Sequence, residues 1–307
     1  WQTLSQWVSR LPVARQNENP WIGYWQGRSL AAVRPREARP ILENAFDFFS
    51  KQGGEDGQLL AATGILESVF FEYEAFSIID SWLDRVSKLL DTQAHARNLE
   101  DELWIQSTFM QAAVLRAPWH PRLRSAVTRV MRLLAQSFDV NLRVGAASML
   151  LEYSNLPVDR SIVQVAKAIA RPLLDSPDLT PYRAAFYWAC EGYTSYLFGH
   201  YDEALLCYDK CEAIAAVSSL EEALKIFLIM RGFCLRRVGH IDAADALVQR
   251  LEKYRSSDGA FFISTFDYFK ALIAFDRGNC NSAVHDAMAA MRVFDICGDA
   301  NTQIAVK

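Results

Sequence analysis

Residues 199–204 read Gly199-His200-Tyr201-Asp202-Glu203-Ala204, and the same spacing of glycine and alanine returns at residues 239–244 and 278–283. The three segments thus follow one another at nearly equal steps along the chain. Glycine can end a helix in a left-handed conformation without steric strain. A small alanine lets two helices approach to about 8–10 Å. The pattern therefore predicts one helix hairpin used three times.

Two further glycines lie inside the expected first helices of these hairpins. Gly192 and Gly232 each interrupt a segment with helical periodicity, where glycine destabilises a helix by about 1 kcal/mol relative to alanine. We expect a side chain of a neighbouring helix to fill the space that a Cβ would occupy at each position.

Helical periodicity extends over nearly the whole chain. Leu205, Tyr208 and Ile214 alternate with polar residues at three- and four-residue steps, which is typical of an amphipathic helix. No sustained two-residue alternation predicts a strand. Upstream of the clear hairpins, weaker starts of second helices lie near Ala38, Phe76, Leu123 and Ser161.

We therefore expect an all-α fold, a right-handed superhelix of about seven antiparallel helix hairpins with a period of about 40 residues. We expect residues 1–307 to form a single array, less regular over 1–181, where all ten prolines lie, and clearer over 182–307. Trp1–Val8 is expected to be a lone second helix, and Asn301–Lys307 the opening of an eighth unit. On this interpretation the chain is an internal fragment of a larger protein.

Composition disfavours several function classes. The 32 Lys and Arg residues and 36 Asp and Glu residues give a net charge of −4, whereas general nucleic-acid binders carry an excess of positive charge. No run of 18 apolar residues predicts a membrane span. The six cysteines match no disulfide or zinc-knuckle spacing, so we expect reduced, buried thiols in a cytoplasmic protein. They are Cys190, Cys207, Cys211, Cys234, Cys280 and Cys297.

Two groups of residues imitate metal sites. Cys207 and Cys211 could hold zinc together with Cys190, but structural zinc sites usually place ligand pairs on turns. His200 and His240 share one repeat position, and equivalent positions lie about 8–10 Å apart, whereas two ligands of one zinc lie within roughly 4 Å. We predict no metal site and no cofactor.

Catalytic signatures are also lacking. Glu100-Asp101-Glu102 resembles a carboxylate pair, but it falls at an expected helix start, where acids complement the helix dipole as solvated caps. The glycine-rich segment 53–57 lacks the lysine of a phosphate-binding loop. We therefore expect that the chain is not an enzyme. The alternative is an enzyme built on a closed toroid of helix hairpins. Such an enzyme would need acids or metal ligands that converge on one rim, and the groups considered above do not supply them.

One hairpin resembles a tetratricopeptide repeat. The residues at the consensus spacing are Trp188, Gly192, Gly199, Tyr201, Ala204 and Tyr208. The step of about 40 rather than 34 residues is similar to the longer superhelical variant found in MalT-type bacterial transcriptional regulators. Residues 20–27, followed by residues 35–45 and preceded by Leu11-Pro12, are also similar to the start of the repeat region in that family.

The resemblance implies a role in binding. In that family an NTPase module and a helical linker come first, the superhelix binds an inducer or an inhibitory partner, and an output domain, often DNA-binding, follows. Switching and output would then lie outside this chain. The resemblance also implies that the first helices of the hairpins line an inner groove.

The consensus register places an aromatic strip with two cations in that groove. These candidate binding residues are Tyr193, Tyr196, Phe233, Arg236, Arg237, Tyr268, Phe275 and Asp276. Aromatic faces can stack on a ligand, and a guanidinium can bind carboxylate or phosphate. Alternatively, Arg236 and Arg237 compensate a helix dipole, and several of the rings belong to the core. Arg116 and Arg143 are weaker candidates in earlier units.

We expect a non-catalytic sensor domain of a MalT-like regulator, which binds a protein or peptide partner, or a small-molecule inducer, in its concave groove. We expect neither direct nucleic-acid contact nor membrane contact from this chain. The alternative is a general tetratricopeptide scaffold for protein–protein interaction, and self-association is a further alternative.

Overall fold

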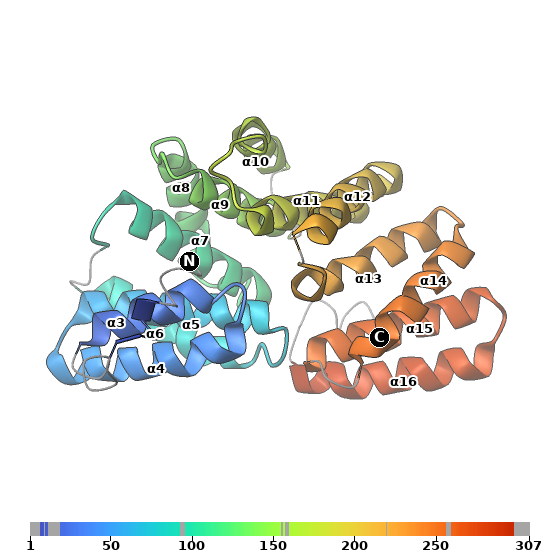
Figure 1. The fold of residues 1–307 in the computed structure, drawn as a ribbon, viewed down its shortest axis with the longest axis horizontal. Helices are drawn as coiled ribbons and strands as arrows, with labels where there is room; N and C mark the ends of the chain where they lie inside the picture. The colour runs from blue at the N-terminus through green and yellow to red at the C-terminus, as the bar shows by residue number, and fades with distance from the viewer. Residues whose placement is uncertain are drawn as a thin grey trace. The chain divides into compact units, whose positions relative to one another are not determined.

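A computed structural model gives the fold as helices joined by short turns (Figure 1). It describes residues 7–8, 10–11, 19–92, 96–154, 156, 160–218, 220–255 and 259–297, without the side chains of 221–223 and 295–297. No strand occurs among these residues, so the expected all-α class is confirmed. The predictions for residues 1–6 and 301–307 lie outside the described residues.

The chain forms two compact units, Trp1–Leu133 and Leu134–Lys307. The first holds α3 (Pro20–Leu30), α4 (Pro35–Gln52), α5 (Glu55–Glu72), α6 (Ile78–Asp91), α7 (Leu99–Arg116) and nearly all of α8 (Leu123–Leu134). The second holds α9 (Val140–Tyr153), α10 (Ser161–Ala170), α11 (Pro181–Leu197), α12 (Tyr201–Val217), α13 (Glu221–Arg237), α14 (Ile241–Leu251), α15 (Ala260–Asp276) and α16 (Cys280–Cys297). Short 3-10 helices, η1 (Arg171–Leu173) and η2 (Glu252–Tyr254), follow α10 and α14.

The three repeated glycines form turns of one geometry. Gly199, Gly239 and Gly278 have φ angles of 81°, 84° and 77°. In each turn the glycine N–H donates to the carbonyl three residues back, and the next N–H donates to the carbonyl five residues back, at 2.8–3.1 Å. Each turn joins two helices that pack together: α11 with α12, α13 with α14, and α15 with α16.

The small residues lie where helices approach most closely. Ala204, Ala244 and Ala283 are all buried. A Cβ on Gly192 would lie 3.1 Å from Cζ of Tyr208, which comes from the paired helix α12. A Cβ on Gly232 would clash with the ring of Phe269, which comes from α15. The expectation that these two glycines make space for neighbouring side chains is therefore confirmed.

Odd-numbered helices, called first helices below, also contact one another in series. In the first unit α5 packs on α3 and α7. In the second unit α11 packs on α9 and α13, and α13 packs on α15. The even-numbered second helices α12 and α14 also contact the first helix that follows each of them. Contacts thus run between neighbours along the chain within each unit.

One helix start differs from its expectation. The acids at 100–102 do occupy the first turn of α7, but Asp101 is buried. Arg97 Nε donates a 2.8 Å hydrogen bond to the Asp101 carboxylate, and this charged partner makes burial of the acid tolerable. Asp101 is thus a buried acid paired with an exposed arginine rather than a solvated cap.

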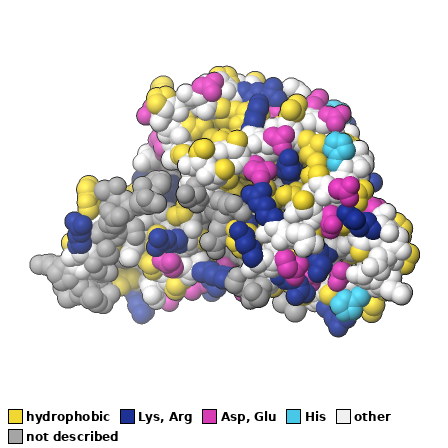
Figure 2. Space-filling view, turned by 45° about the vertical axis from the view of Figure 1, so that its right-hand side comes forward, with side chains coloured by type: hydrophobic (Ala, Val, Ile, Leu, Met, Phe, Trp, Pro, Cys, Tyr) yellow, Lys and Arg dark blue, Asp and Glu magenta, His cyan; other side chains and the backbone are white. Residues whose placement is uncertain are grey.

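Charges of both signs are mixed on the surface. On the face shown in Figure 2, Lys and Arg side chains lie among Asp and Glu side chains rather than in one block. Among the described residues, no helix is both long enough and apolar enough to cross a membrane.

Candidate functional site

Aromatic rings from three first helices form a continuous series in the second unit. On α11, the rings of Tyr193 and Tyr196 stack with centroids 6.5 Å apart. The ring of Phe233 on α13 lies 6.4 Å from that of Tyr196 and 6.0 Å from that of Tyr268 on α15. These four residues are called the aromatic strip below. The structure thus brings together four of the eight candidates from α11, α13 and α15.

The strip has a buried centre and more exposed ends. Phe233 is only 8% exposed, and its ring makes an edge-on contact with Phe269 at 5.4 Å. The adjacent Gly232 admits the Phe269 ring, so α15 covers Phe233. Phe233 is therefore a core residue that supports the strip, whereas Tyr193, Tyr196 and Tyr268 are partly exposed.

Arg237 places a positive charge beside the tyrosines. This exposed residue ends α13, and hydrogen bonding to Tyr196, with the nearby hydroxyls of Tyr201 and Tyr268, raises the pKa of its guanidinium. Burial raises the pKa of Tyr196, and Arg237 only partly offsets that increase. Near neutral pH the group is therefore a fixed cation among neutral hydroxyls.

Tyr201 is a member of this group that sequence reasoning did not assign to the site. Its ring lies 5.7 Å from that of Tyr196, because the turn at Gly199 folds the first residue of α12 back beside the last turn of α11. Because the repeated glycine predicts the position of this turn, the sequence could have indicated that Tyr201 lies beside the end of α11.

Arg236 and Asp276 form a separate contact. Arg236 Nε and Nη2 donate to the two carboxylate oxygens of Asp276 at 2.5 and 3.0 Å. The side chains are 18% and 20% exposed, so the pair is largely enclosed. The two candidates neutralise each other and join the ends of α13 and α15. Phe275, beside them, is exposed.

The two weaker candidates lie on other helices than the strip, α7 and α9. Arg116 Nε and Nη2 donate to Asp80 on α6 at 2.8 and 2.6 Å, in the first unit. Arg143 lies near the start of α9, and its Nε is buried without a hydrogen-bond partner.

A charged contact recurs at one repeat position, which sequence reasoning also missed. Glu191, Arg231 and Lys270 lie in the middle of α11, α13 and α15, at the same steps along the chain as the repeated glycines. Each pairs with opposite charges on the preceding second helix or on the 3-10 helix that follows it. For Glu191 the acid lies on the first helix, whereas for Arg231 and Lys270 the acids lie on the preceding element. The partners are Lys167 and Arg171 for Glu191, Asp209 and Glu212 for Arg231, and Glu252 for Lys270.

The most deeply buried of these charges is Glu191. Burial by itself would raise the pKa of Glu191, but the hydrogen bond from Arg171, the nearby hydroxyl of Tyr187 and the charge of Lys167 hold it below its ordinary value. Lys167 Nζ lies 3.2 Å from the carboxylate. Glu191 is therefore an ionised contact between α10 and α11 rather than a general base with a raised pKa.

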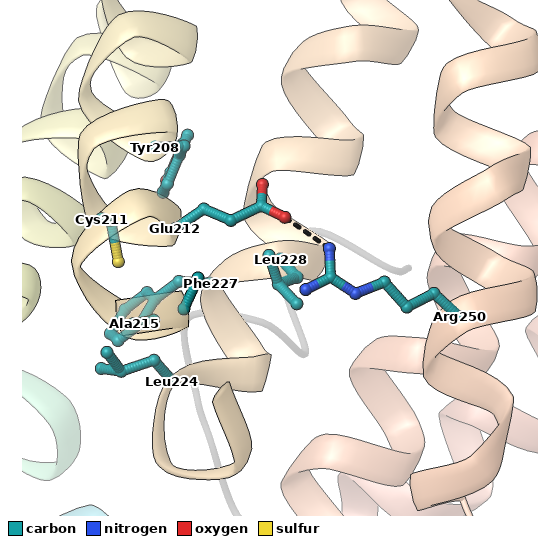
Figure 3. A pocket seen from close by; sticks show the side chains of 9 residues that line it. Tyr208, Cys211, Glu212, Ala215, Leu224, Phe227, Leu228 and Arg250 are labelled. Atoms are coloured by element: carbon teal, nitrogen blue, oxygen red, sulfur yellow. Dashed lines mark hydrogen bonds and ion pairs between the residues drawn. The ribbon is translucent and has the colours of Figure 1, made fainter. Parts of the chain in front are cut away.

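A pocket opens between α12, α13 and α14 (Figure 3). Its charged side chains, Glu212 and Arg250, point toward each other and form an ion pair (Figure 3). The ring tip of Tyr208 is directed at Gly192 on α11. The remaining lining is mostly apolar, and none of the candidate residues belongs to it. The lining residues are Tyr208, Cys211, Glu212, Ala215, Ala216, Leu224, Phe227, Leu228 and Arg250.

Most of the thiols are inert core groups. Burial raises the pKa of Cys207, Cys211 and Cys234 to about 12, and a protonated thiol is a poor ligand and nucleophile. Cys190 is also buried, but Cys280 is exposed, which corrects the expectation that all the cysteines are buried. The side chain of Cys297 lies outside the described residues. In the described part of the chain, no three His, Cys, Asp or Glu side chains gather as a metal site.

No protein family model matches this chain, and no curated protein matches its sequence. The resemblance to tetratricopeptide repeats therefore rests on the residues and turns described above.

Proposed function

We propose that this chain is a non-catalytic recognition module made of stacked helix hairpins similar to tetratricopeptide repeats. The proposal extends to about seven hairpins in one right-handed array over residues 1–307. Three observations support it: the three glycine turns of one geometry, the series of contacts between first helices, and the charged contact that recurs once in each of three successive hairpins.

The aromatic strip with Arg237 is the observation that carries the binding role. A tyrosine ring offers both an apolar face and a hydroxyl group, and a guanidinium binds a carboxylate or phosphate through parallel hydrogen bonds. Arg237 is exposed among three tyrosines, whereas Arg236 is already paired. Because the strip crosses three helices, it suits an extended ligand with an acidic group, such as a peptide.

The wider role that we propose is that of a cytoplasmic sensor region, similar to the repeat region of MalT-type transcriptional regulators. Each hairpin in such an array contacts only its neighbours, so a ligand that bridges several hairpins can favour one set of small rotations between them. A general scaffold for protein partners is the second candidate, and the extent of the strip over three helices favours it.

Calorimetric titration of the whole chain tests this function. The probes are a pool of acidic peptides, a pool of neutral oligosaccharides and a set of small dicarboxylates. Binding of peptides alone favours a protein partner, and binding of a small molecule favours a sensor. For whichever probe binds, we expect Arg237→Ala to weaken the affinity by at least about tenfold, equivalent to about 1.4 kcal/mol.

Two variants make the test specific. Arg292→Ala removes an exposed arginine whose guanidinium donates to the Met288 carbonyl of its own helix α16, and should leave the affinity unchanged. Tyr196→Phe keeps the ring but removes the hydroxyl that contacts Arg237, and should have an intermediate effect. Equal affinity of Arg237→Ala and the unmodified chain for every probe that binds would remove the assignment of this site.

A further inference from the structure

Residues 103–138 contain five arginines but no lysine, aspartate or glutamate. They include most of α7, the whole of α8 and the loop between these helices. Because the whole chain has a net charge of −4, positive charge is concentrated in this segment. Three of the arginines, Arg116, Arg122 and Arg129, each form an ion pair with an acid on α6 or α7. These acids are Asp80, Asp91 and Glu102, respectively.

The other two arginines, Arg124 and Arg132, are exposed on α8. Neither forms an ion pair with any residue that the structure describes. They are eight residues apart, which places them on one side of the helix about 12 Å from each other. Thr128 lies between them, and its hydroxyl donates to the Arg124 carbonyl of the same helix at 3.1 Å. These three residues are called the arginine face below.

The exposed surface of α8 differs from that of the other second helices in its unit. Helix α4 exposes Glu37 and Asp47, and α6 exposes Asp80 and Asp84. Both of these helices also expose basic side chains, so their surface charges are mixed. Helix α8 contains no acid at all. Its arginine face therefore complements a negatively charged partner.

An exposed tryptophan precedes this helix. Trp119 is 78% exposed and lies between Pro118 and Pro121, whose rings restrict the backbone. The His120 N–H donates to the carbonyl three residues back at 2.8 Å, and His120 Nδ1 accepts from the Arg122 N–H at 3.2 Å. Because the loop is held in this way, little conformational freedom is lost when a partner contacts the tryptophan ring. Tryptophan and arginine are enriched among the residues that dominate binding energy.

We propose that the arginine face and Trp119 bind an acidic helix of a protein partner. Two acids that lie eight residues apart on one side of that helix match the spacing of Arg124 and Arg132, and an apolar side chain of the partner packs on Trp119. A helix satisfies its own backbone hydrogen bonds, whereas an extended segment would need donors and acceptors that α8 does not offer. This surface lies on other elements than the aromatic strip, so the proposal does not depend on what the strip binds.

The size and chemistry of the surface favour a protein over other anionic partners. A nucleic acid is held through many phosphate contacts, but the arginine face offers two cations, and the negative net charge of the chain repels a polyanion. A membrane surface is bound by helices that insert large apolar side chains. The residues exposed between the two arginines are instead Ser125 and Thr128.

Fluorescence anisotropy of labelled peptides with the full chain tests the proposal. The probe is an alanine-rich helical peptide of about 20 residues with one leucine and with glutamate at every fourth position. The control peptide has glutamine at the same positions. The glutamate peptide should bind in the micromolar range, at least about tenfold more tightly than the glutamine peptide. Raising the salt concentration from about 50 to 500 mM should weaken its binding.

A charge-reversal variant locates the binding. Arg124→Glu combined with Arg132→Glu should weaken binding of the glutamate peptide by at least about tenfold. The control combines Arg34→Glu and Lys51→Glu, which make the same change of net charge at exposed positions at the two ends of α4. This control should bind as the unmodified chain does. Circular dichroism checks that both double variants keep their helix content.

Two single variants separate this surface from the aromatic strip. Trp119→Ala should weaken binding of the glutamate peptide by about fivefold or more, and Arg237→Ala should leave it unchanged. Equal affinity of the arginine double variant and its control would overturn the proposal, as would equal binding of the two peptides. Binding of single-stranded RNA or phosphatidylserine vesicles through these arginines, without binding of the glutamate peptide, would also overturn it.

Discussion

At the scale of single residues, Gly232 marks a close approach between two first helices, α13 and α15. An added Cβ would clash with the ring of Phe269, which is fully buried. Gly232→Ala should therefore lower the free energy of unfolding by about 1–3 kcal/mol, the usual range for overpacked cores, although alanine is the better helix former. Urea unfolding followed by circular dichroism measures the change.

Gly23→Ala is the matched control. Gly23 also lies inside a helix, but its nearest neighbour beyond its own helix is 3.8 Å from the position of an added Cβ, an ordinary contact distance. This variant should raise the free energy of unfolding of its own unit by about 0.5–1 kcal/mol through helix propensity. An equal loss in both variants would show that close approach does not explain Gly232.

Glu191 is a residue whose contribution to stability depends on pH. Because its pKa in the folded chain lies below the ordinary value, its contribution is present above the unfolded-state pKa and is lost as the pH falls through the folded value. Between about pH 6 and pH 3, Glu191→Gln should therefore lose less stability than the unmodified chain. At neutral pH the variant should be less stable by about 1.5–3 kcal/mol.

Thermal unfolding at several pH values measures this difference, with Glu203→Gln as the control. Glu203 is an exposed acid on α12, and its replacement should leave the pH profile nearly unchanged. Parallel profiles for Glu191→Gln and the unmodified chain would contradict the role of Glu191 as a buried anion.

At the scale of helices, local signals were enough to predict turns and close contacts. Gly199 and its two equivalents determine where helices end, because a left-handed residue is a property of the local backbone. The choice between Arg236 and Arg237 was not predictable in this way. The two arginines are adjacent in the sequence, so their side chains leave α13 in different directions. Only the position of α15 decides that Arg236 contacts Asp276 while Arg237 stays among the tyrosines.

The exposure of the rings was unpredictable for the same reason. Phe233 and Tyr193 occupy equivalent positions of successive repeats, yet α15 covers Phe233 and leaves Tyr193 partly exposed. The sequence thus predicted which helices carry the candidate site. The packing of the following hairpin decides which of its residues remain accessible.

The pair of Arg236 and Asp276 should connect α13 and α15 energetically. Its two hydrogen bonds and its low exposure favour a coupling near the upper end of the range for partly exposed pairs, about 1 kcal/mol. The measurement is a double-mutant cycle in urea with Arg236→Ala, Asp276→Ala and the double variant. Additive effects of the two substitutions would show that the contact does not couple the helices.

At the scale of the whole molecule, the proposed function requires an array in which each hairpin is stabilised by its neighbours. The described contacts within each unit join helices that are close in the sequence order. In such an array a local defect destabilises the adjacent hairpins most and distant ones little. In a domain with one shared core, a defect lowers the protection of all elements together.

Hydrogen exchange followed by mass spectrometry on Gly232→Ala tests this claim most directly, because it reads every helix of the intact chain. Relative to the unmodified chain, we expect the largest loss of protection against exchange in α13 and α15, smaller losses in α11 and α16, and little change in α9 and α10. A uniform loss of protection from α9 to α16 would contradict it.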